Sequence, residues 1–265
     1  MTDPVRELAA LTWAGAEGML RQHPIGLLPV GAIEAHGPHL PFDTDVIIAT
    51  EMARGAARLL DRDGLATLLL PPLTYGVSFV GTCFGGTSPV DPSAFEAHLY
   101  SLLTNMLPQG YRAIVICNAH LEPAHVEAVR AAAGRAAETT GVPVVFPDKR
   151  EARWAARLSE EFRRGARHAG SYETALVMAA RPDAVRRDEL ESLPPVWVDL
   201  PARLRAGARS FAEAGGTRGY FGDPARASVD EGEMLFAALA AMVRDAVLEV
   251  LAGTGGEGVK GGEVR

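Results

Sequence analysis

Cysteine is scarce in this chain, which has only Cys83 and Cys117 among 265 residues. They do not form a Cys-x-x-Cys pair, and two thiols in so long a chain make neither a disulfide framework nor a four-thiolate zinc cage. Long apolar runs are also missing, because no stretch of about 18 residues is apolar enough to predict a transmembrane helix. The first ten residues contain charged side chains and no apolar signal core. We therefore expect a cytoplasmic protein without a membrane partner.

Positive charge is in the minority as well. The chain has 26 Lys and Arg against 33 Asp and Glu, which gives a net charge of −7. Sequence-independent binding of nucleic acids needs clustered cationic side chains that displace counterions, and no Lys/Arg block occurs here. We expect no nucleic-acid partner.

The composition is that of a globular protein, with 48% hydrophobic and 22% charged residues. Neither an internal repeat nor a linker between independent domains is evident. The end of the chain, residues 253–265, is rich in glycine and poor in apolar residues. We predict one domain over residues 1–252 and a disordered tail over 253–265.

Apolar runs of strand length alternate with longer helical patterns. The predicted strands are residues 25–33, 65–73, 113–117 and 142–146. The predicted helices between and after them are residues 46–60, 93–107, 123–139, 153–167, 172–180 and 230–251. This alternation favours an α/β fold of three layers, α/β/α, with a mostly parallel central sheet.

A carboxylate and an imidazole follow two of the predicted strands at the same spacing. Glu34 and His36 follow the first strand, and His120 and Glu122 follow the third. Residues two apart on an extended segment point to the same side, so each pair can aim both ligands at one pocket. Nitrogen and carboxylate oxygen ligands suit Zn or Mn, with Fe also possible. Ligands of parallel sheets gather at the carboxyl ends of the strands, where both pairs are expected.

Asp45 is a fifth ligand candidate, nine residues beyond His36. Five ligands are too many for one open catalytic zinc but fit two ions roughly 3.5–4 Å apart that share a carboxylate. Our assignment has Asp45 as the bridge, Glu34 and His120 on one ion, and His36 and Glu122 on the other. The alternative for Asp45 is a capping role at the start of the helix that follows.

At these residues the chain resembles the creatininase (creatinine amidohydrolase) family. The segment 28–41, Leu-Pro-Val-Gly-Ala-Ile-Glu-Ala-His-Gly-Pro-His-Leu-Pro, is similar to the family's first signature, as is the Thr-Asp pair at 44–45. Later stretches match in order: Phe-Gly-Gly-Thr at 84–87, Asn-Ala-His-Leu-Glu at 118–122, His-Ala-Gly-Ser-Tyr-Glu-Thr at 168–174, and Gly-Asp-Pro at 222–224. These matches extend over most of the chain.

The resemblance implies a creatininase-like fold, a dinuclear site with the same five ligands, and often a hexameric assembly. It also implies hydrolysis of a non-peptide or cyclic amide. We therefore expect a metal-dependent amidohydrolase in which hydroxide bridging two ions attacks the C–N bond of a small cyclic or linear amide. The expected partners are this small amide substrate and further copies of the chain in a homohexamer.

The residues that contact substrate in the family are only partly kept. Ser78 matches a substrate-contacting serine, but Leu121 stands where creatininases have tyrosine. The family's Trp-Asp pair falls on Arg163 and Arg164, or on Arg164 and Gly165, depending on where a residue is inserted. Creatinine is therefore not the expected substrate. Arg164 suggests a carboxylate or phosphate on the substrate, because guanidinium groups pair with such anions.

Three residues are expected to act in catalysis: His168, Glu173 and Glu122. His168 is the candidate general acid that protonates the leaving nitrogen and also contacts substrate. Glu173 could orient His168 or move the proton itself, and Glu122 is the ligand whose loss should stop turnover. The alternative for His168 is a histidine at a helix end, satisfied by a nearby carbonyl.

Two other functions stay open at this point. A deformylase or small peptidase of the same family would need a wider, more polar pocket with room for a chain. A metal-binding scaffold without turnover would be indicated by a lost ligand, and no ligand is missing. A nucleotide-binding fold is excluded, because no Gly-x-Gly-x-x-Gly follows the first strand.

Overall fold

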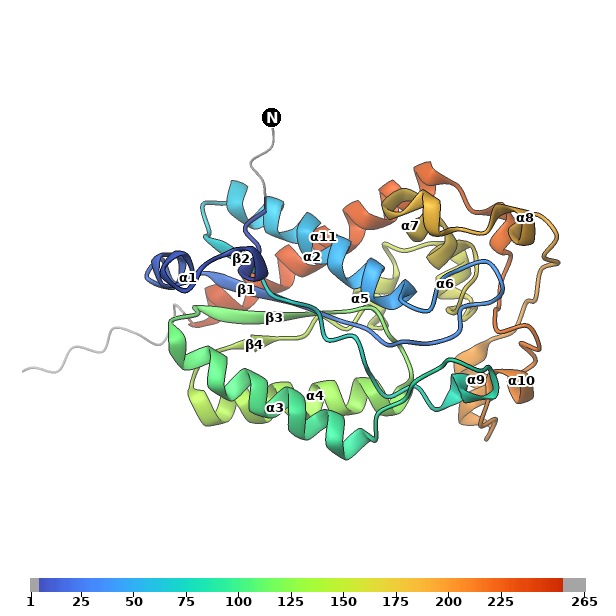
Figure 1. Ribbon diagram of the computed structural model, residues 1–265, viewed down its shortest axis with the longest axis horizontal. Coiled ribbons are helices and arrows are strands. Elements are labelled where there is room, and N and C mark those ends of the chain that lie inside the picture. The colour runs from blue at the N-terminus through green and yellow to red at the C-terminus, as the bar shows by residue number, and fades with distance from the viewer. Residues whose placement is uncertain (1–4, 255–265) are drawn as a thin grey trace, which may run out of the picture.

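The computed structural model describes residues 5–254, and its centre is a four-stranded sheet (Figure 1). The strand order is β2-β1-β3-β4 and every pairing is parallel. The strands are β1 Ile25–Val30, β2 Thr67–Leu69, β3 Ala113–Asn118 and β4 Val144–Val145. All residues of β1 and β3 are buried, as parallel strands covered on both faces must be.

Long helices cover both faces of the sheet (Figure 1). On one face α2 Thr44–Arg62, α7 Ser171–Ala180 and α11 Val229–Thr254 pack together, and on the other α3 Pro92–Met106 packs on α4 Pro123–Thr140. Two separate apolar cores lie on either side of the sheet. The predicted three-layer α/β/α fold with a parallel sheet is confirmed.

The apolar side chains of β1 explain how one strand serves two cores. Ile25 and Leu27 belong to the core under α2, whereas Leu28 and Val30 belong to the core over α3 and α4. Alternate side chains of a strand point to opposite faces, so an almost wholly apolar strand can fill both.

The predicted strands are shorter in the structure. The strand expected over residues 65–73 is regular only over Thr67–Leu69, because Pro71 and Pro72 have no N–H to donate to a ladder. The strand expected over 25–33 ends at Val30, and a loop carries the chain onward.

The helix predicted over 153–167 is wrong as one element. It is two helices of four residues, α5 Ala152–Ala155 and α6 Glu160–Arg163. The hydroxyl of Ser159 accepts a hydrogen bond from the backbone N–H of Phe162, so it caps a new helix instead of continuing the old one. Gly165, with a φ of +93°, then turns the chain away.

Short helices close one end of the molecule, next to the carboxyl ends of the strands. They are α8 Arg187–Leu190, α9 Leu200–Arg205 and α10 Phe211–Ala214. A small third core joins them, made of Ala166, Leu200, Phe211, Ala214 and Phe221. The remaining elements are α1 Trp13–Leu20 and the 3-10 turns Leu8–Ala10, Val80–Cys83, Leu107–Gln109, Pro182–Ala184 and Pro224–Arg226.

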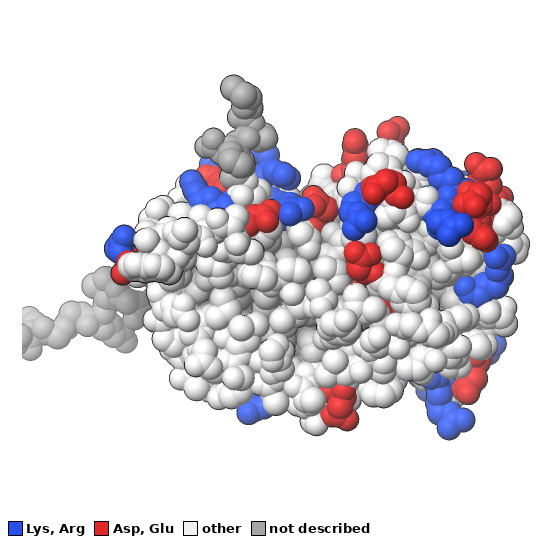
Figure 2. Space-filling model, in the orientation of Figure 1, with Lys and Arg blue, Asp and Glu red and all other residues white. Residues whose placement is uncertain are grey.

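Charges of both signs are interspersed on the face drawn in Figure 2. Ion pairs also link separate elements of the structure, such as Arg244 with Asp63 and Arg157 with Asp245. Within residues 5–254, no helix is long and apolar enough to span a bilayer. Helix α11 runs to Thr254, so the first two residues of the predicted tail 253–265 are helical, and residues 255–265 lie outside the described part.

Candidate metal centre

The two predicted acid–histidine pairs meet at one edge of the sheet. Strands β1 and β3 are neighbours in register, with Val30 opposite Asn118, so the loops that follow them emerge side by side. The first loop carries Glu34 and His36, and the second carries His120 and Glu122. Parallel pairing thus brings together residues almost ninety positions apart in the sequence.

Asp45 joins them from the first turn of α2. The loop after β1 passes so close to this turn that a Cβ on Gly31 would lie 2.8 Å from the backbone nitrogen of Val46. Only glycine permits this approach. Of the side chains that meet here, Glu34, His36 and Asp45 are each 1% exposed, so their charges face one another and not water.

Backbone carbonyls fix the tautomer of each histidine. The carbonyl of Glu34 accepts from Nδ1 of His36 at 3.0 Å, and that of Val77 accepts from Nε2 of His120 at 2.7 Å. A carbonyl can only accept, so these nitrogens carry the proton. The opposite nitrogens, Nε2 of His36 and Nδ1 of His120, face the carboxylates, and each offers a lone pair to a cation once its proton is displaced. Such partners are typical of metal-ligating histidines.

Asp45 lies between the two histidines. Its Oδ1 is 3.5 Å from Nε2 of His36, and its Oδ2 is 3.0 Å from Nδ1 of His120. Oε2 of Glu34 is 3.4 Å from the same nitrogen of His120, and Oε2 of Glu173 is 3.6 Å from Nε2 of His36. One carboxylate with an oxygen toward each histidine has the arrangement of a bridge between two cations.

The ligand atoms fall into groups whose members lie within 4.8 Å of one another. One group is Glu34, His120 and Glu122, and another is His36, Asp45 and Glu173. The sequence paired Glu122 with His36, whereas the structure brings Glu173 to His36. Sequence reasoning expected Glu173 to orient His168 or to move the proton, and not to bind metal, because no strand-end pattern marks it as a ligand.

The donor set fits divalent cations. Among residues 5–254, the buried atoms Nε2 of His36 and Oδ2 of Asp45 have no hydrogen-bond partner. Burial lowers the pKa of both histidines, but Asp45 with Glu173 raises that of His36 to about 10, and Glu34 with Asp45 raises that of His120 to about 9. Burial raises the pKa of Glu34 to about 7 despite both histidines. Cations that bind here would displace these protons and take their place among the carboxylates.

A short segment, residues 77–80, makes hydrogen bonds to His120, Glu34 and Glu122, and we call it the strap. The Val77 carbonyl is the one that accepts from His120, and the hydroxyl of Ser78 donates to Oε1 of Glu34 at 2.7 Å. Ser78 is fully buried and does not line the pocket. Its predicted place against substrate is therefore corrected: it positions Glu34 instead.

The strap also holds Glu122. The backbone N–H groups of Phe79 and Val80 donate to its two carboxylate oxygens at 3.1 and 3.0 Å. Two donors from consecutive residues fix both the position and the orientation of the carboxylate.

His125 fastens the strap to helix α4, a role that sequence reasoning missed. Its Nδ1 accepts from the backbone N–H of Val77 at 3.3 Å, and its Nε2 meets Oδ1 of Asn118 at 3.0 Å. Its side chain is fully buried, in the first turn of α4. His125 lies five residues after His120, and this spacing carries no signal that would have distinguished it.

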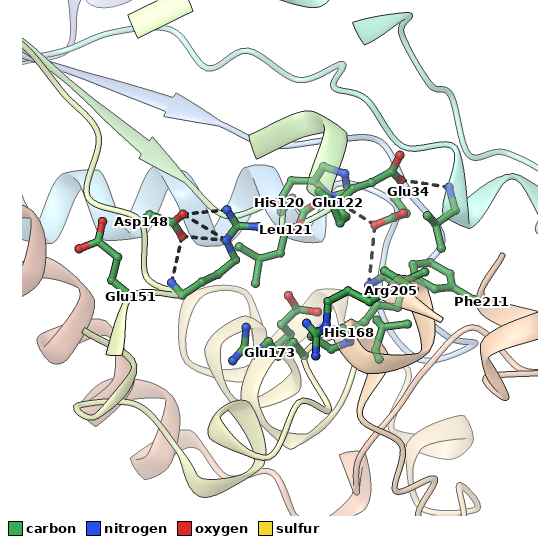
Figure 3. A pocket seen from close by; sticks show the side chains of 18 residues that line it. Glu34, His120, Leu121, Glu122, Asp148, Glu151, His168, Glu173, Arg205 and Phe211 are labelled. Carbon is green, nitrogen blue, oxygen red and sulfur yellow. Dashed lines mark hydrogen bonds and ion pairs between the residues drawn. The ribbon is translucent and has the colours of Figure 1, made fainter. Parts of the chain in front are cut away.

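A cavity of about 610 Å³ opens onto the centre (Figure 3). Glu34, His120 and Glu122 border it on one side, and His168 and Glu173 lie across from them (Figure 3). Its lining also includes Asp45, Val80, Leu121, Asp148, Arg150, Glu151, Arg167, Leu200, Leu204, Arg205 and Phe211. Leu121 thus lines the cavity, and its contact with substrate stays a prediction.

Arg164 does not belong to this cavity. Its side chain is exposed, its guanidinium lies over the ring of Trp197 at 5.1 Å, and it pairs with Glu160 at 3.7 Å. The predicted contact of Arg164 with substrate is therefore corrected. Gly165 turns the chain after α6 outward at this point, and the arginines that do line the cavity are Arg150, Arg167 and Arg205.

His168 and Glu173 are held where the segment before α7 meets the first loop. Nε2 of His168 donates to the Ala35 carbonyl at 2.9 Å, which leaves Nδ1 facing Oε2 of Glu34 at 3.7 Å. Its ring stacks on Phe211 with centroids 4.0 Å apart. Oε2 of Glu173 accepts from the N–H of Ala169 at 2.7 Å. Burial, with His36 nearby, lowers the pKa of His168 well below its usual value, so its imidazole is neutral.

Comparisons with known proteins agree with this picture. The model of a family described as creatininase, creatinine amidohydrolase, matches residues 9–247. A mycofactocin precursor peptide peptidase of Mycobacterium ulcerans (strain Agy99) is 33% identical over 238 residues, 87% of this chain and 86% of that protein. A creatinine amidohydrolase of Pseudomonas putida is 27% identical over 264 residues, 90% of this chain and 95% of that protein.

Solved structures give the same fold. One described as Creatininase Mn superposes with a TM-score of 0.71 at 24% identity and covers 93% of this chain and 99% of that one. A mutant creatininase of Zn-Zn type has a TM-score of 0.68 at 23% identity, with 94% and 99% covered.

Proposed function

This chain belongs to the creatininase family of hydrolases, and we propose that it cleaves the C–N bond of an amide with two divalent metal ions at the strand ends. The observation that carries the proposal is Asp45, with one carboxylate oxygen toward His36 and the other toward His120. A carboxylate whose two oxygens face different histidines would suit two ions that share it better than a single ion.

In the proposed centre Glu34, His120 and Asp45 hold one ion, and His36, Asp45 and Glu173 hold the other. Nitrogen and carboxylate ligands without a thiolate suit Zn or Mn. Ions of this kind would supply Lewis acidity and would lower the pKa of bound water toward neutrality.

The residues around the ions then have distinct tasks. Neutral His168 presents the lone pair of Nδ1 toward the cavity, so it accepts a hydrogen bond from an amide N–H and orients the substrate. A general acid must be protonated before it can donate to the leaving nitrogen, and the lowered pKa of His168 does not suit this. We therefore assign the proton transfer to Glu122. Its carboxylate is held by two N–H groups of the strap and borders the cavity. Leu121 supplies an apolar side and keeps bulk water from the reacting carbon.

The cavity favours a substrate larger and more polar than creatinine. Its volume of about 610 Å³ is within the range of sites that enclose drug-sized ligands. Three arginines line it where an uncharged cyclic amide needs none. A small peptidase is therefore the second candidate, supported by the volume of the cavity, by its arginines and by the 33% identical precursor peptide peptidase.

The test is hydrolysis by the purified protein of a panel of cyclic amides including creatinine, formyl amides and short peptides. We expect turnover of at least one class, its loss on chelation, and its return on addition of Zn or Mn. Turnover that persists after chelation and in Asp45→Asn would contradict the proposal.

A further inference from the structure

The carboxylates at the far side of the cavity are already neutralised by partners of their own. Figure 3 labels these two residues, Asp148 and Glu151. Asp148 accepts from Arg130 and from Arg150, each at 2.8 Å, and Glu151 pairs with Arg153 at 3.3 Å. The remaining carboxylates of the lining are those of the proposed metal centre. An arginine left over in this cavity is therefore not required to balance a protein charge.

Arg167 is such an arginine. Its half-buried side chain lines the cavity, and its Nε donates to the carbonyl of Phe162 at 2.8 Å. The guanidinium lies over the ring of Phe162, 4.6 Å from the centroid. Within residues 5–254 no carboxylate lies within ion-pairing distance of it, so its terminal N–H groups have no acid to bind.

The other two arginines of the lining differ from Arg167, because their charges are either paired with an acid or solvated. Arg150 is held by Asp148, and Arg205 is exposed at the end of α9, where water solvates its charge. Burial lowers the pKa of Arg167, although Asp199 acts in the opposite direction, so its cation is under-solvated as it stands. A half-buried guanidinium that is held in place through Nε and lacks an acid binds an oxyanion well.

We propose that Arg167 binds an oxyanion of the substrate, a carboxylate or a phosphate, while the amide of the same molecule reaches the metal centre. Arg167 immediately precedes His168, whose lone pair faces that centre, so one segment of chain contacts both ends of the substrate. The substrate class is then an acidic amide. This inference rests on the proposed function for the role of the amide, but anion binding can be measured without turnover.

The test uses the metal-loaded protein and three N-acetylated peptides that differ in one group. One has a free terminal carboxylate, one has a terminal carboxamide, and one is the carboxamide with a phosphoserine side chain. Titration calorimetry gives their dissociation constants for the wild type, Arg167→Gln, Arg167→Lys and Arg164→Gln. Arg164→Gln is the matched control, since it removes a neighbouring guanidinium outside the cavity.

We expect at least one anionic peptide to bind the wild type roughly ten- to a hundredfold more tightly than the carboxamide, as one charged hydrogen-bonded pair allows. Arg167→Gln should abolish this preference, Arg167→Lys should keep part of it, and Arg164→Gln should match the wild type. The anionic peptide that binds more tightly shows whether the site takes the terminal carboxylate of a peptide or a phosphate. Metal content and unfolding temperature are measured on every variant to identify any that has lost its fold. If Arg167→Gln has lost its fold, the anion preference of Arg167→Lys decides the question.

Equal binding of all three peptides, no binding of any, or an equal loss for all three in Arg167→Gln would overturn the inference. Hydrolysis of the same peptides is followed separately. Arg167-dependent binding without any turnover would refute the proposed hydrolase and leave the anion site standing. Turnover without anion preference would refute the anion site and leave the proposed hydrolase standing.

Discussion

Two regions face each other across the cavity, and they are built in different ways. The acid–histidine cluster, Glu34, His36, Asp45 and His120, is buried at the ends of long, fully covered strands, and backbone carbonyls fix both histidines. The opposite wall, α6, α9 and α10, consists of helices of four to six residues around a small core of its own. Helices so short depend on packing and caps for their stability.

We infer from this difference that the cluster carries the metal chemistry and that the wall selects the substrate. The cluster needs ligand atoms fixed within fractions of an ångström, which rigid strands and the strap provide. The wall carries Arg167, Phe211 and Leu200, and its sequence can change without moving a ligand. Changes in the cluster should therefore remove metal and turnover together, whereas changes in the wall should alter substrate binding and leave the metal in place.

The largest effect is expected from the two carboxylates whose assignment differs between sequence and structure. Glu173→Gln should lose the ion at His36, and turnover should fall by more than the roughly 100-fold that loss of an outer partner costs. Glu122→Gln should keep that ion and lose turnover. Adding His36→Ala to Glu173→Gln should remove no further metal, while adding His120→Ala should remove the rest. If Glu122→Gln and not Glu173→Gln behaves as the partner of His36, the pairing from the sequence is right.

Metal affinity at the acid–histidine cluster should depend strongly on pH, and the opposite wall should contribute nothing to this dependence. In the metal-free protein the pKa of His120 is about 9 and that of His36 about 10, so both carry a proton at neutral pH that an ion must displace. Affinity should rise with pH by on the order of tenfold per unit for each proton released, up to about pH 9. Calorimetry in buffers of different ionisation enthalpy counts these protons. Affinity that is flat between pH 6 and 8 would contradict the buried carboxylate cluster.

The same pKa values give the sign for stability without metal. Both histidines titrate above their ordinary 6.5 in the folded state, so their contribution is complete below that pH. It is lost as the pH rises through about 9 and 10. The metal-free protein should therefore unfold more easily in alkali than the loaded protein.

A smaller effect is expected at the strap. Ser78→Ala removes the hydrogen bond to Glu34 and should weaken the ion at His120 by roughly 10- to 100-fold, as losses of outer partners do. Competition with a fluorescent chelator measures it. Ser192→Ala is the matched control, because that exposed hydroxyl bonds only to the Glu189 carbonyl. Unchanged affinity in Ser78→Ala would mean that Glu34 is fixed without the strap.

The smallest effect should come from the wall. Phe211→Leu removes the ring stacked on His168, a contact worth about 0.5–1.5 kcal/mol in aromatic pairs. KM should rise a few-fold because His168 is less well oriented toward substrate, while the metal content stays that of the wild type. Loss of metal in this variant would show that the wall supports the cluster, and the division between the two regions would fail.

Sequence patterns predicted the cluster and the layers but not the wall. Glu34, His36, His120 and Glu122 follow apolar strands, and the position of a strand end is local information. Asp45 was proposed from its distance along the chain, and it does lie between the histidines. The helix over 153–167 failed because Ser159 and Gly165 end and restart helices by local hydrogen bonding and backbone conformation, which apolar periodicity does not record.

Positions that depend on tertiary contacts were the ones missed. Arg164 was chosen from the register of a motif, and a register cannot say which nearby arginine a turn directs into the cavity. His125 was left without a role because its partner, the N–H of Val77, lies 48 residues away. Glu173 reaches His36 only through the packing of α7 on α2.

The most direct test of the account is the metal stoichiometry of purified protein after chelation and titration with Zn or Mn, for the wild type and for Asp45→Asn. A shared carboxylate predicts about two ions per chain in the wild type and weakened binding of both in the variant, with folding intact by circular dichroism. One ion per chain in the wild type, or loss of only one in Asp45→Asn, would contradict a bridged dinuclear centre.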